Sequence, residues 1–90
     1  MNVNDPMNYA NQVRDFVVEN FLFGDKGSLK DDTSFLDEGV VDSTGMLELI
    51  MFLESTYDIK VQPEEMIPDN LDSVTRVAGF LTKKAAKAAA

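Results

Sequence analysis

Cysteine, histidine and tryptophan are all missing from this chain of 90 residues. Without cysteine the chain forms no disulfide and offers no thiolate nucleophile, and without histidine it lacks the commonest general base at neutral pH. The usual zinc ligands are missing with them. We therefore expect no catalytic residue and no metal site of its own, so that any chemistry needs a group supplied by a cofactor or a partner.

Basic residues are scarce, with eight lysines and arginines against 16 acidic residues and a net charge of −8. Three of the eight, Lys83, Lys84 and Lys87, lie in the alanine-rich segment 83–90, so residues 1–82 carry five basic and 16 acidic groups, a net charge of −11. Such a surface repels nucleic acid and anionic lipid and attracts basic partner proteins.

Long apolar runs are absent as well, since none approaches the roughly 18 residues of a membrane span. Residues 1–6 show no signal-peptide pattern, so we expect a cytoplasmic protein without membrane contact. Ninety residues are near the lower limit for a self-supporting core, which leaves little room for a deep enzyme cleft. We expect one domain over residues 1–82 and a Lys/Ala-rich tail over 83–90 that either extends the last helix or is disordered.

A first helix is predicted from just after Asp5, with Pro6 in the first helical position, to about Phe23. Its apolar residues on helical spacing are expected to face inward: Val13, Phe16, Val17 and Phe21. Residues 24–41 are rich in Gly, Asp, Ser and Lys and predict a long loop. A loop of that length in so small a domain indicates a function or a specific packing role.

A second helix is predicted to start at Asp42 or Ser43, where a short polar side chain accepts the free backbone N–H groups of the first turn. One stripe of this helix is expected to be buried: Met46, Leu49, Ile50, Leu53 and Tyr57. A second stripe recurs on the opposite face and must meet solvent or a partner: Thr44, Glu48, Met51 and Ser55.

The remaining chain predicts a short helical turn over Pro63–Ile67, ended by Pro68, and a last helix from about Asp72 or Ser73. The inner face of the last helix is expected to comprise Val74, Val77, Ala78 and Leu81, with Gly79 weakening it locally. No segment alternates with period two. The predicted fold class is therefore all-α, a bundle of three main helices with a short fourth helix between the last two.

Asp42-Ser43 alone reads as a helix cap, but its context is more specific. A long loop ending in Gly39-Val40-Val41 precedes it, an amphipathic helix follows, and a short acidic turn leads to a last helix. Over about residues 9–82 this order resembles the acyl carrier protein family, the phosphopantetheine-binding carrier domains. The resemblance implies an acyl-carrier-protein-like fold, and it implies that Ser43, preceded by Asp42, receives 4′-phosphopantetheine from coenzyme A.

The resemblance implies a carrier and not an enzyme: a monomer that holds acyl or aminoacyl groups as thioesters and is a substrate for other proteins. The expected partners are a phosphopantetheinyl transferase, an adenylate-forming ligase or acyltransferase, and downstream acyl-processing enzymes. The resemblance places Glu48 and Met51 where the family meets its partners, with Glu54 adding negative charge nearby and Thr44 and Ser55 on the same exposed stripe.

Three residues depart from the family pattern. Thr44 stands where an apolar residue is usual, Phe52 where a small one is common, and Gly45 loosens the first turn at a cost of up to about 1 kcal/mol. Because Thr44 and Phe52 alter the usual partner face, we expect a specialised acyl or aminoacyl cargo and not an ordinary fatty acid.

Other interpretations stay open at this point. Thr44 is a second possible acceptor of the arm, although Asp42-Ser43 fits the pattern better. Acidic residues before the second helix suggest calcium, but they lack the EF-hand spacing, and a solvated acidic loop is the simpler interpretation. A second hypothesis is an acidic helical adaptor that has the same fold but no prosthetic group. In this case the surface of net charge −11 and the exposed Glu48 and Met51 would bind a partner directly.

Overall fold

The computed structural model describes residues 6–24, 27 and 29–89, with the side chains of 8–24, 27 and 29–85. Asp5, expected just before the first helix, lies outside the described residues. The described part contains the helices α1 (Pro6–Phe21), α2 (Ser43–Tyr57), α3 (Pro68–Leu71) and α4 (Val74–Ala89), a 3-10 turn η2 (Pro63–Glu65), and no strand. The predicted all-α bundle with a short helix before the last one is confirmed.

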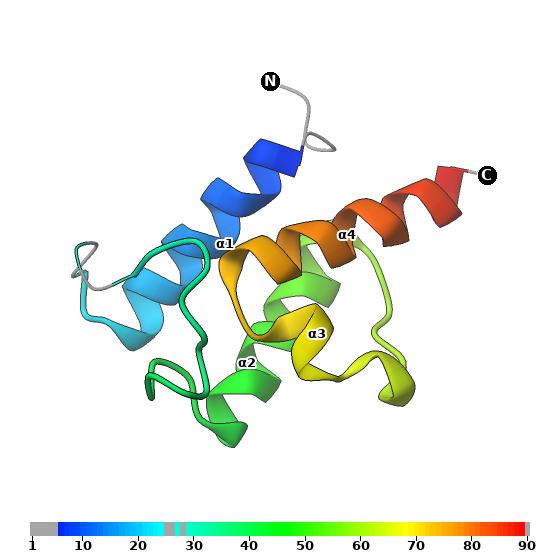
Figure 1. Ribbon diagram of the computed structural model, residues 1–90. Coiled ribbons are helices and arrows are strands. Elements are labelled where there is room, and N and C mark those ends of the chain that lie inside the picture. Colours follow the sequence, from blue (N-terminus) through cyan, green and yellow to red (C-terminus); the bar gives the residue numbers. More distant parts are fainter. Residues whose placement is uncertain (1–5, 25–26, 28, 90) are drawn as a thin grey trace.

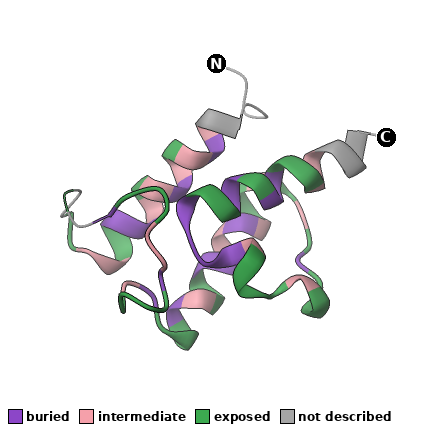
Figure 2. Cartoon of the chain, in the orientation of Figure 1, coloured by how far each residue is buried: buried purple, intermediate pink, exposed green. Residues whose placement is uncertain are grey.

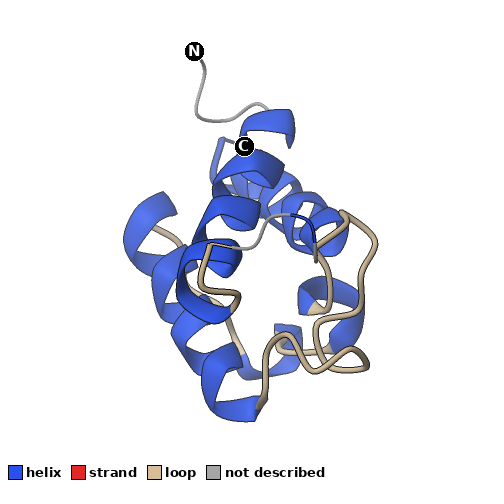
Figure 3. Ribbon diagram, turned by 90° about the vertical axis from the view of Figure 1, so that its left-hand side faces the viewer, coloured by secondary structure: helices blue, strands red, loops and turns tan. Residues whose placement is uncertain are grey.

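The helices enclose one apolar core, and α4 packs against both α1 and α3 (Figure 1). The amino end of α2, at the bottom of Figure 1, lies on the opposite side of the molecule from the two chain ends. Figure 3 shows long loops joining the helices, and Figure 2 shows that buried residues lie where the helices face one another. None of the described helices is long and apolar enough to cross a membrane.

Helix α1 ends at Phe21, two residues before the predicted end. The backbone turns into the left-handed region at Phe23 (φ 52°) and Gly24 (φ 86°), and the Gly24 N–H donates to Val18 O over 2.9 Å. This hydrogen bond satisfies a carbonyl of the last turn and closes the end of the helix, and Phe23 in the left-handed turn is 97% exposed. Val13 and Val17 are fully buried as expected, whereas Phe16 and Phe21 are partly buried against the core.

The predicted loop before α2 is held in place by Asp72. Its carboxylate accepts hydrogen bonds from the Ser34 hydroxyl and, over 2.9 Å, from the Leu36 N–H, while its backbone carbonyl accepts from the Phe35 N–H over 2.8 Å. Phe35 itself is fully buried. The last helix was predicted to start near Asp72 or Ser73, and Ser73 caps α4 by accepting the Arg76 N–H over 3.1 Å. Asp72 is therefore a clamp between the loop and the start of α4.

Helix α2 begins at Ser43, as predicted, and its buried stripe is confirmed. Leu49, Ile50 and Leu53 are buried, and Met46 and Tyr57 are partly buried against the core. Asp58 ends the helix in the left-handed conformation, with φ 54°.

Gly45, in the first turn of α2, is buried. A β-carbon added there would lie 2.8 Å from Phe21 Cε1 and 3.1 Å from Val41 Cγ1. The prediction that Gly45 merely weakens the helix is therefore incomplete. Glycine suits this position because a β-carbon would force the side chains of Phe21 and Val41 to shift.

The segment after α2 differs from the prediction. The helical turn expected over Pro63–Ile67 is only the 3-10 turn η2, and Pro68 begins α3 where it was expected to end a helix. The N–H of a residue in the first helical turn has no acceptor within the helix, so proline loses no hydrogen bond there. Because proline also has a helical φ angle, it suits the start of a helix. Glu65 stabilises η2 by accepting the Gln62 N–H over 2.9 Å.

Helix α4 buries the predicted inner face, Val74, Val77, Ala78 and Leu81, and also Phe80. It continues through the Lys/Ala-rich tail to Ala89. Within the tail, the Lys84 ammonium lies 2.9 Å from a Glu65 carboxylate oxygen, and the two side chains are only 17% and 20% exposed. The domain boundary at residue 82 stays a prediction.

The two glycines in helices should respond to alanine in opposite ways. At Gly79 an added β-carbon meets no atom within 4 Å, so Gly79→Ala should raise the free energy of unfolding by about 0.5–1 kcal/mol. At Gly45 the crowding by Phe21 should make Gly45→Ala lower it by about 1–3 kcal/mol. Urea denaturation followed by circular dichroism measures both values. A Gly45→Ala variant as stable as Gly79→Ala would contradict the packing described for this turn.

Removing the Asp72 carboxylate should destabilise the fold. Asp72→Ala leaves the Ser34 hydroxyl and the Leu36 N–H without their acceptor, so the free energy of unfolding should fall by about 2–3 kcal/mol. Asp69→Ala is the matched control, because Asp69 is 87% exposed and makes only a 3.9 Å ion pair with Arg76. Its cost should stay below about 1 kcal/mol. Equal losses for the two variants in urea denaturation would refute the clamp.

Candidate functional site

Ser43 is the first residue of α2, and its side chain is exposed. The neighbouring Asp42 is the N-cap: its carboxylate accepts the Gly45 N–H over 2.7 Å, and its carbonyl accepts the Met46 N–H over 2.8 Å. The carboxylate of Asp42 is thereby directed to the helix end. The serine hydroxyl stands beside it on the surface, at a fixed point of a rigid helix.

The amino end of α2 suits a negatively charged group attached at Ser43. The first N–H groups of a helix have no intrahelical acceptor, and the helix dipole places partial positive charge there. A phosphodiester bonded to the Ser43 hydroxyl would lie at this end. The position therefore fits the attachment of 4′-phosphopantetheine, because it offers an exposed hydroxyl, a favourable field and a backbone held by Asp42 and Gly45.

The predicted outer stripe of α2 is exposed along its whole length, with Met51 67% exposed. Its members are Thr44, Glu48, Met51 and Ser55. They extend from the residue after Ser43 to near the end of α2 and share no side with the buried stripe. Their role in binding partners stays a prediction.

Glu54, unlike the residues of that exposed stripe, is held by a hydrogen bond to another segment of the chain. One of its carboxylate oxygens accepts the Val61 N–H over 2.9 Å, and the side chain is partly buried. Glu54 thus ties the end of α2 to the segment that follows it, and its predicted contribution to partner binding stays a prediction.

Leu47 is an exposed apolar residue that the sequence analysis did not single out. It is 58% exposed and lies one helical turn after Ser43 and one turn before Met51. The i, i+4 spacing of these three residues was available in the sequence and indicates that they share a face. The surface next to Ser43 is therefore more apolar than Thr44 alone suggests.

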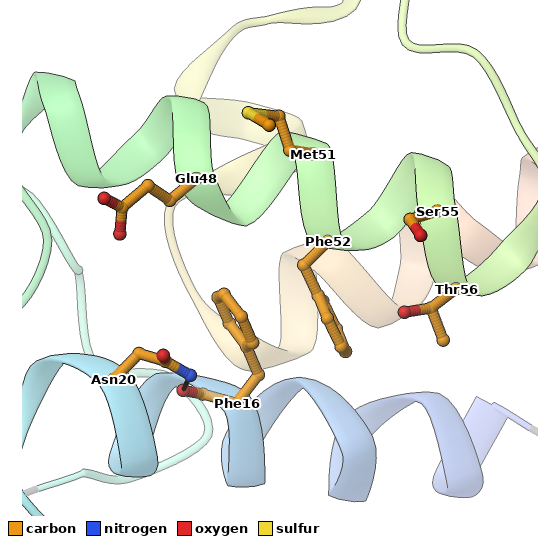
Figure 4. Close-up of a pocket in the computed structure, with 7 residues that line it drawn as sticks. All are labelled: Phe16, Asn20, Glu48, Met51, Phe52, Ser55 and Thr56. Atoms are coloured by element: carbon orange, nitrogen blue, oxygen red, sulfur yellow. Dashed lines mark hydrogen bonds between the residues drawn. The ribbon is translucent and has the colours of Figure 1, made fainter.

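Phe52, which replaces a small residue of the family pattern, packs against α1. Its ring stacks on Phe16 with 4.2 Å between centroids and an interplanar angle of 17° (Figure 4). It also makes a T-shaped contact with Tyr57, with 6.2 Å between centroids. Burial, together with the nearby Tyr9, raises the pKa of Tyr57 to about 12. The Tyr57 hydroxyl donates a hydrogen bond to Gln12 Oε1.

The acidic residues form no metal site in the part of the chain that the structure describes, where no group of three or more Asp or Glu residues is arranged to hold an ion. Asp31 pairs with Arg14, and Asp42 caps α2.

The chain was compared with family models and with individual known proteins. No family model matches it. However, D-alanyl carrier proteins of Streptococcus pyogenes serotype M5 (strain Manfredo), serotype M49 (strain NZ131) and serotype M1 are each 40% identical to it over 67 residues. The aligned region spans 72% of this chain and 85% of each relative. With the all-helical fold, this similarity shows that the chain belongs to the phosphopantetheine-binding carrier protein family.

Proposed function

We propose that the protein is a stand-alone carrier that bears 4′-phosphopantetheine on Ser43. The observation that carries the proposal is the exposed Ser43 hydroxyl at the amino end of α2, beside the Asp42 cap. The arm, when bound, supplies the thiol on which acyl or aminoacyl groups travel as thioesters. This chain has no cysteine that could supply a thiol of its own.

The residues around Ser43 have separate tasks in this proposal. Asp42 fixes the first turn of α2 through the Gly45 N–H, so that the serine hydroxyl is held at a constant position for a transferase. The helix end then stabilises the phosphodiester anion. Gly45 lets α1 approach the turn, which leaves the outer face of α2 open beside the attachment point.

The proposed cargo is an aminoacyl or short acyl group, with D-alanine as the first candidate. The support is the name of the relatives, D-alanyl carrier protein, together with two departures from the family pattern, Thr44 and Phe52. Thr44 is exposed next to Ser43 and makes the start of the partner face polar. Phe52 stacks on Phe16 and is partly buried, so a large aromatic ring occupies this position in place of a small residue.

The proposed partners are a phosphopantetheinyl transferase, which modifies Ser43, an adenylate-forming ligase, and downstream enzymes that receive the cargo, all in the cytoplasm. They would dock on Thr44, Glu48, Met51 and Ser55, with Leu47 adding apolar area. A net charge of −11 over residues 1–82 favours basic docking surfaces and accelerates encounter with them.

Modification of Ser43 is tested by incubating the protein with a promiscuous phosphopantetheinyl transferase and coenzyme A and measuring the intact mass. We expect the wild type to gain the mass of one arm and Ser43→Ala to gain none. Thr75→Ala is the matched control, because Thr75 is an exposed hydroxyl residue on α4, outside the proposed docking surface, and the variant should be modified like the wild type. No gain on the wild type, or an undiminished gain on Ser43→Ala, would leave the unmodified adaptor as the better interpretation.

The cargo is tested by offering the modified protein to a panel of adenylate-forming ligases with ATP and different acids. We expect a D-alanine-activating ligase to add one alanyl group, detected by intact mass and released by hydroxylamine, which cleaves thioesters. Ser43→Ala, which lacks the arm, should acquire nothing. Efficient loading and elongation by fatty-acid synthase enzymes, without loading by any amino acid-activating ligase, would contradict the proposed cargo.

A further inference from the structure

Two adjoining hollows of about 390 and 380 Å³ lie between α1 and α2. They share Phe16, Asn20, Phe52 and Thr56 and therefore adjoin each other, and we call this shallow, open surface between the two helices the α1–α2 groove. Figure 4 shows Phe16 and Phe52 pointing toward each other across it from the two helices. Ser43 does not line the groove.

The two walls of the groove have the same spacing. The residues from α1 are Gln12, Asp15, Phe16, Glu19 and Asn20. The residues from α2 are Glu48, Met51, Phe52, Ser55 and Thr56. Each set recurs at i, i+3, i+4, i+7 and i+8, which is one face of a helix over two turns, about 12 Å. The groove is thus bounded by two helical stripes of equal length.

The groove has an apolar floor and an acidic rim. Phe16 and Phe52 are stacked and partly buried, and Met51 adds a 67% exposed apolar side chain. The charged residues that line it are Asp15, Glu19 and Glu48, all of them acidic and all exposed. No lysine or arginine is among the residues that line either hollow. Occupants with apolar and cationic groups are therefore complementary to it.

We propose that the α1–α2 groove docks a short basic amphipathic helix of a partner protein. A helix laid between two helical stripes packs ridges into grooves, as an added member of a bundle does. Its apolar i, i+3, i+4 and i+7 side chains would cover Phe16, Phe52 and Met51, and lysines or arginines on its flanks would face the acidic rim.

This docking does not depend on the arm. Ser43 precedes Phe52 by nine positions in α2, so that about 13 Å of helix separates them along its axis. A partner held in the groove would leave Ser43 accessible, and it would raise the effective concentration of the arm at that partner's active site. The proposal shares only Glu48, Met51 and Ser55 with the predicted partner face, and it stands or falls separately from the modification of Ser43.

The test uses the full chain and a synthetic helical peptide of leucine, lysine and alanine. The peptide carries leucines at i, i+3, i+4 and i+7 and lysines on both flanks, and a peptide of the same composition in scrambled order is its control. Affinity is measured by calorimetry, and the site is mapped from amide chemical shifts in ¹⁵N spectra. We expect shifts concentrated at Phe16, Asn20, Phe52 and Thr56, and binding of Ser43→Ala equal to that of the wild type.

Reversing the charge of rim residues distinguishes binding of the peptide in the groove from non-specific electrostatic attraction to the acidic protein. The double variant Asp15→Lys and Glu19→Lys should weaken binding of the amphipathic peptide about tenfold or more, because like charges would meet. The matched control, Asp37→Lys and Glu64→Lys, makes the same change in net charge at exposed residues outside the groove and should weaken it about twofold or less.

Four results would overturn the proposal. They are equal losses for the two double variants, equal affinity for the scrambled peptide, chemical shifts confined to other surfaces, and a dimer in sedimentation experiments that Asp15→Lys with Glu19→Lys disperses. The last result would assign the groove to a second copy of this chain. Loss of transferase modification with peptide binding intact would refute only the proposed function.

Discussion

The phenyl ring of Phe21 lies against Gly45, and a β-carbon added at Gly45 would lie 2.8 Å from Phe21 Cε1 and force that ring to shift. This contact fixes how near the two helices approach at one end, and the Asp42 carboxylate fixes the same turn from the other side through the Gly45 N–H. With the turn held, the phase of α2 is set. Leu49 and Leu53 face the core, while Ser43 and Met51 face outward.

The second support of the site is the loop that leads into α2. Asp72 holds it through the Ser34 hydroxyl and the Leu36 N–H, and Phe35 is anchored in the core. Ordering a loop of this length costs conformational entropy, which these contacts offset, and without them the start of α2 would be poorly placed. The clamp couples the position of Ser43 to the start of α4. A substitution of Asp72 should therefore change the position of Ser43, although Asp72 makes no hydrogen bond to Ser43 or to its neighbours Asp42 and Gly45.

Much of this arrangement could be predicted from local patterns. The start of α2 and its buried and exposed stripes follow from residues close together in the sequence. Ser43 as the candidate attachment site depends on the resemblance over about residues 9–82. The errors concern contacts between distant residues. The sequence predicts Gly45 only as a weak point, because Phe21 is far away in the sequence. It does not predict the hydrogen bonds of Asp72 to the loop, because Ser34 and Leu36 are also far away in the sequence. Pro68 starts a helix instead of ending one because the 3-10 turn before it is shorter than expected.

The groove between α1 and α2 also required the structure, because each helix contributes one stripe and neither stripe alone indicates a binding surface. Phe52 illustrates the point, since in the sequence it was only a departure from the family pattern, whereas in the structure it stacks on Phe16 and forms the floor of the groove. The same helix therefore has an attachment point at its amino end and an apolar, acid-rimmed face farther along.

The central claim is that α2 presents one hydroxyl, that of Ser43, for modification. The most direct measurement is fragmentation mass spectrometry of the peptide that contains Ser43 and Thr44, after reaction of the wild-type protein with coenzyme A and a phosphopantetheinyl transferase. The account predicts that the fragments place the whole added mass on Ser43. An arm located on Thr44, or on a serine outside this peptide, would contradict it.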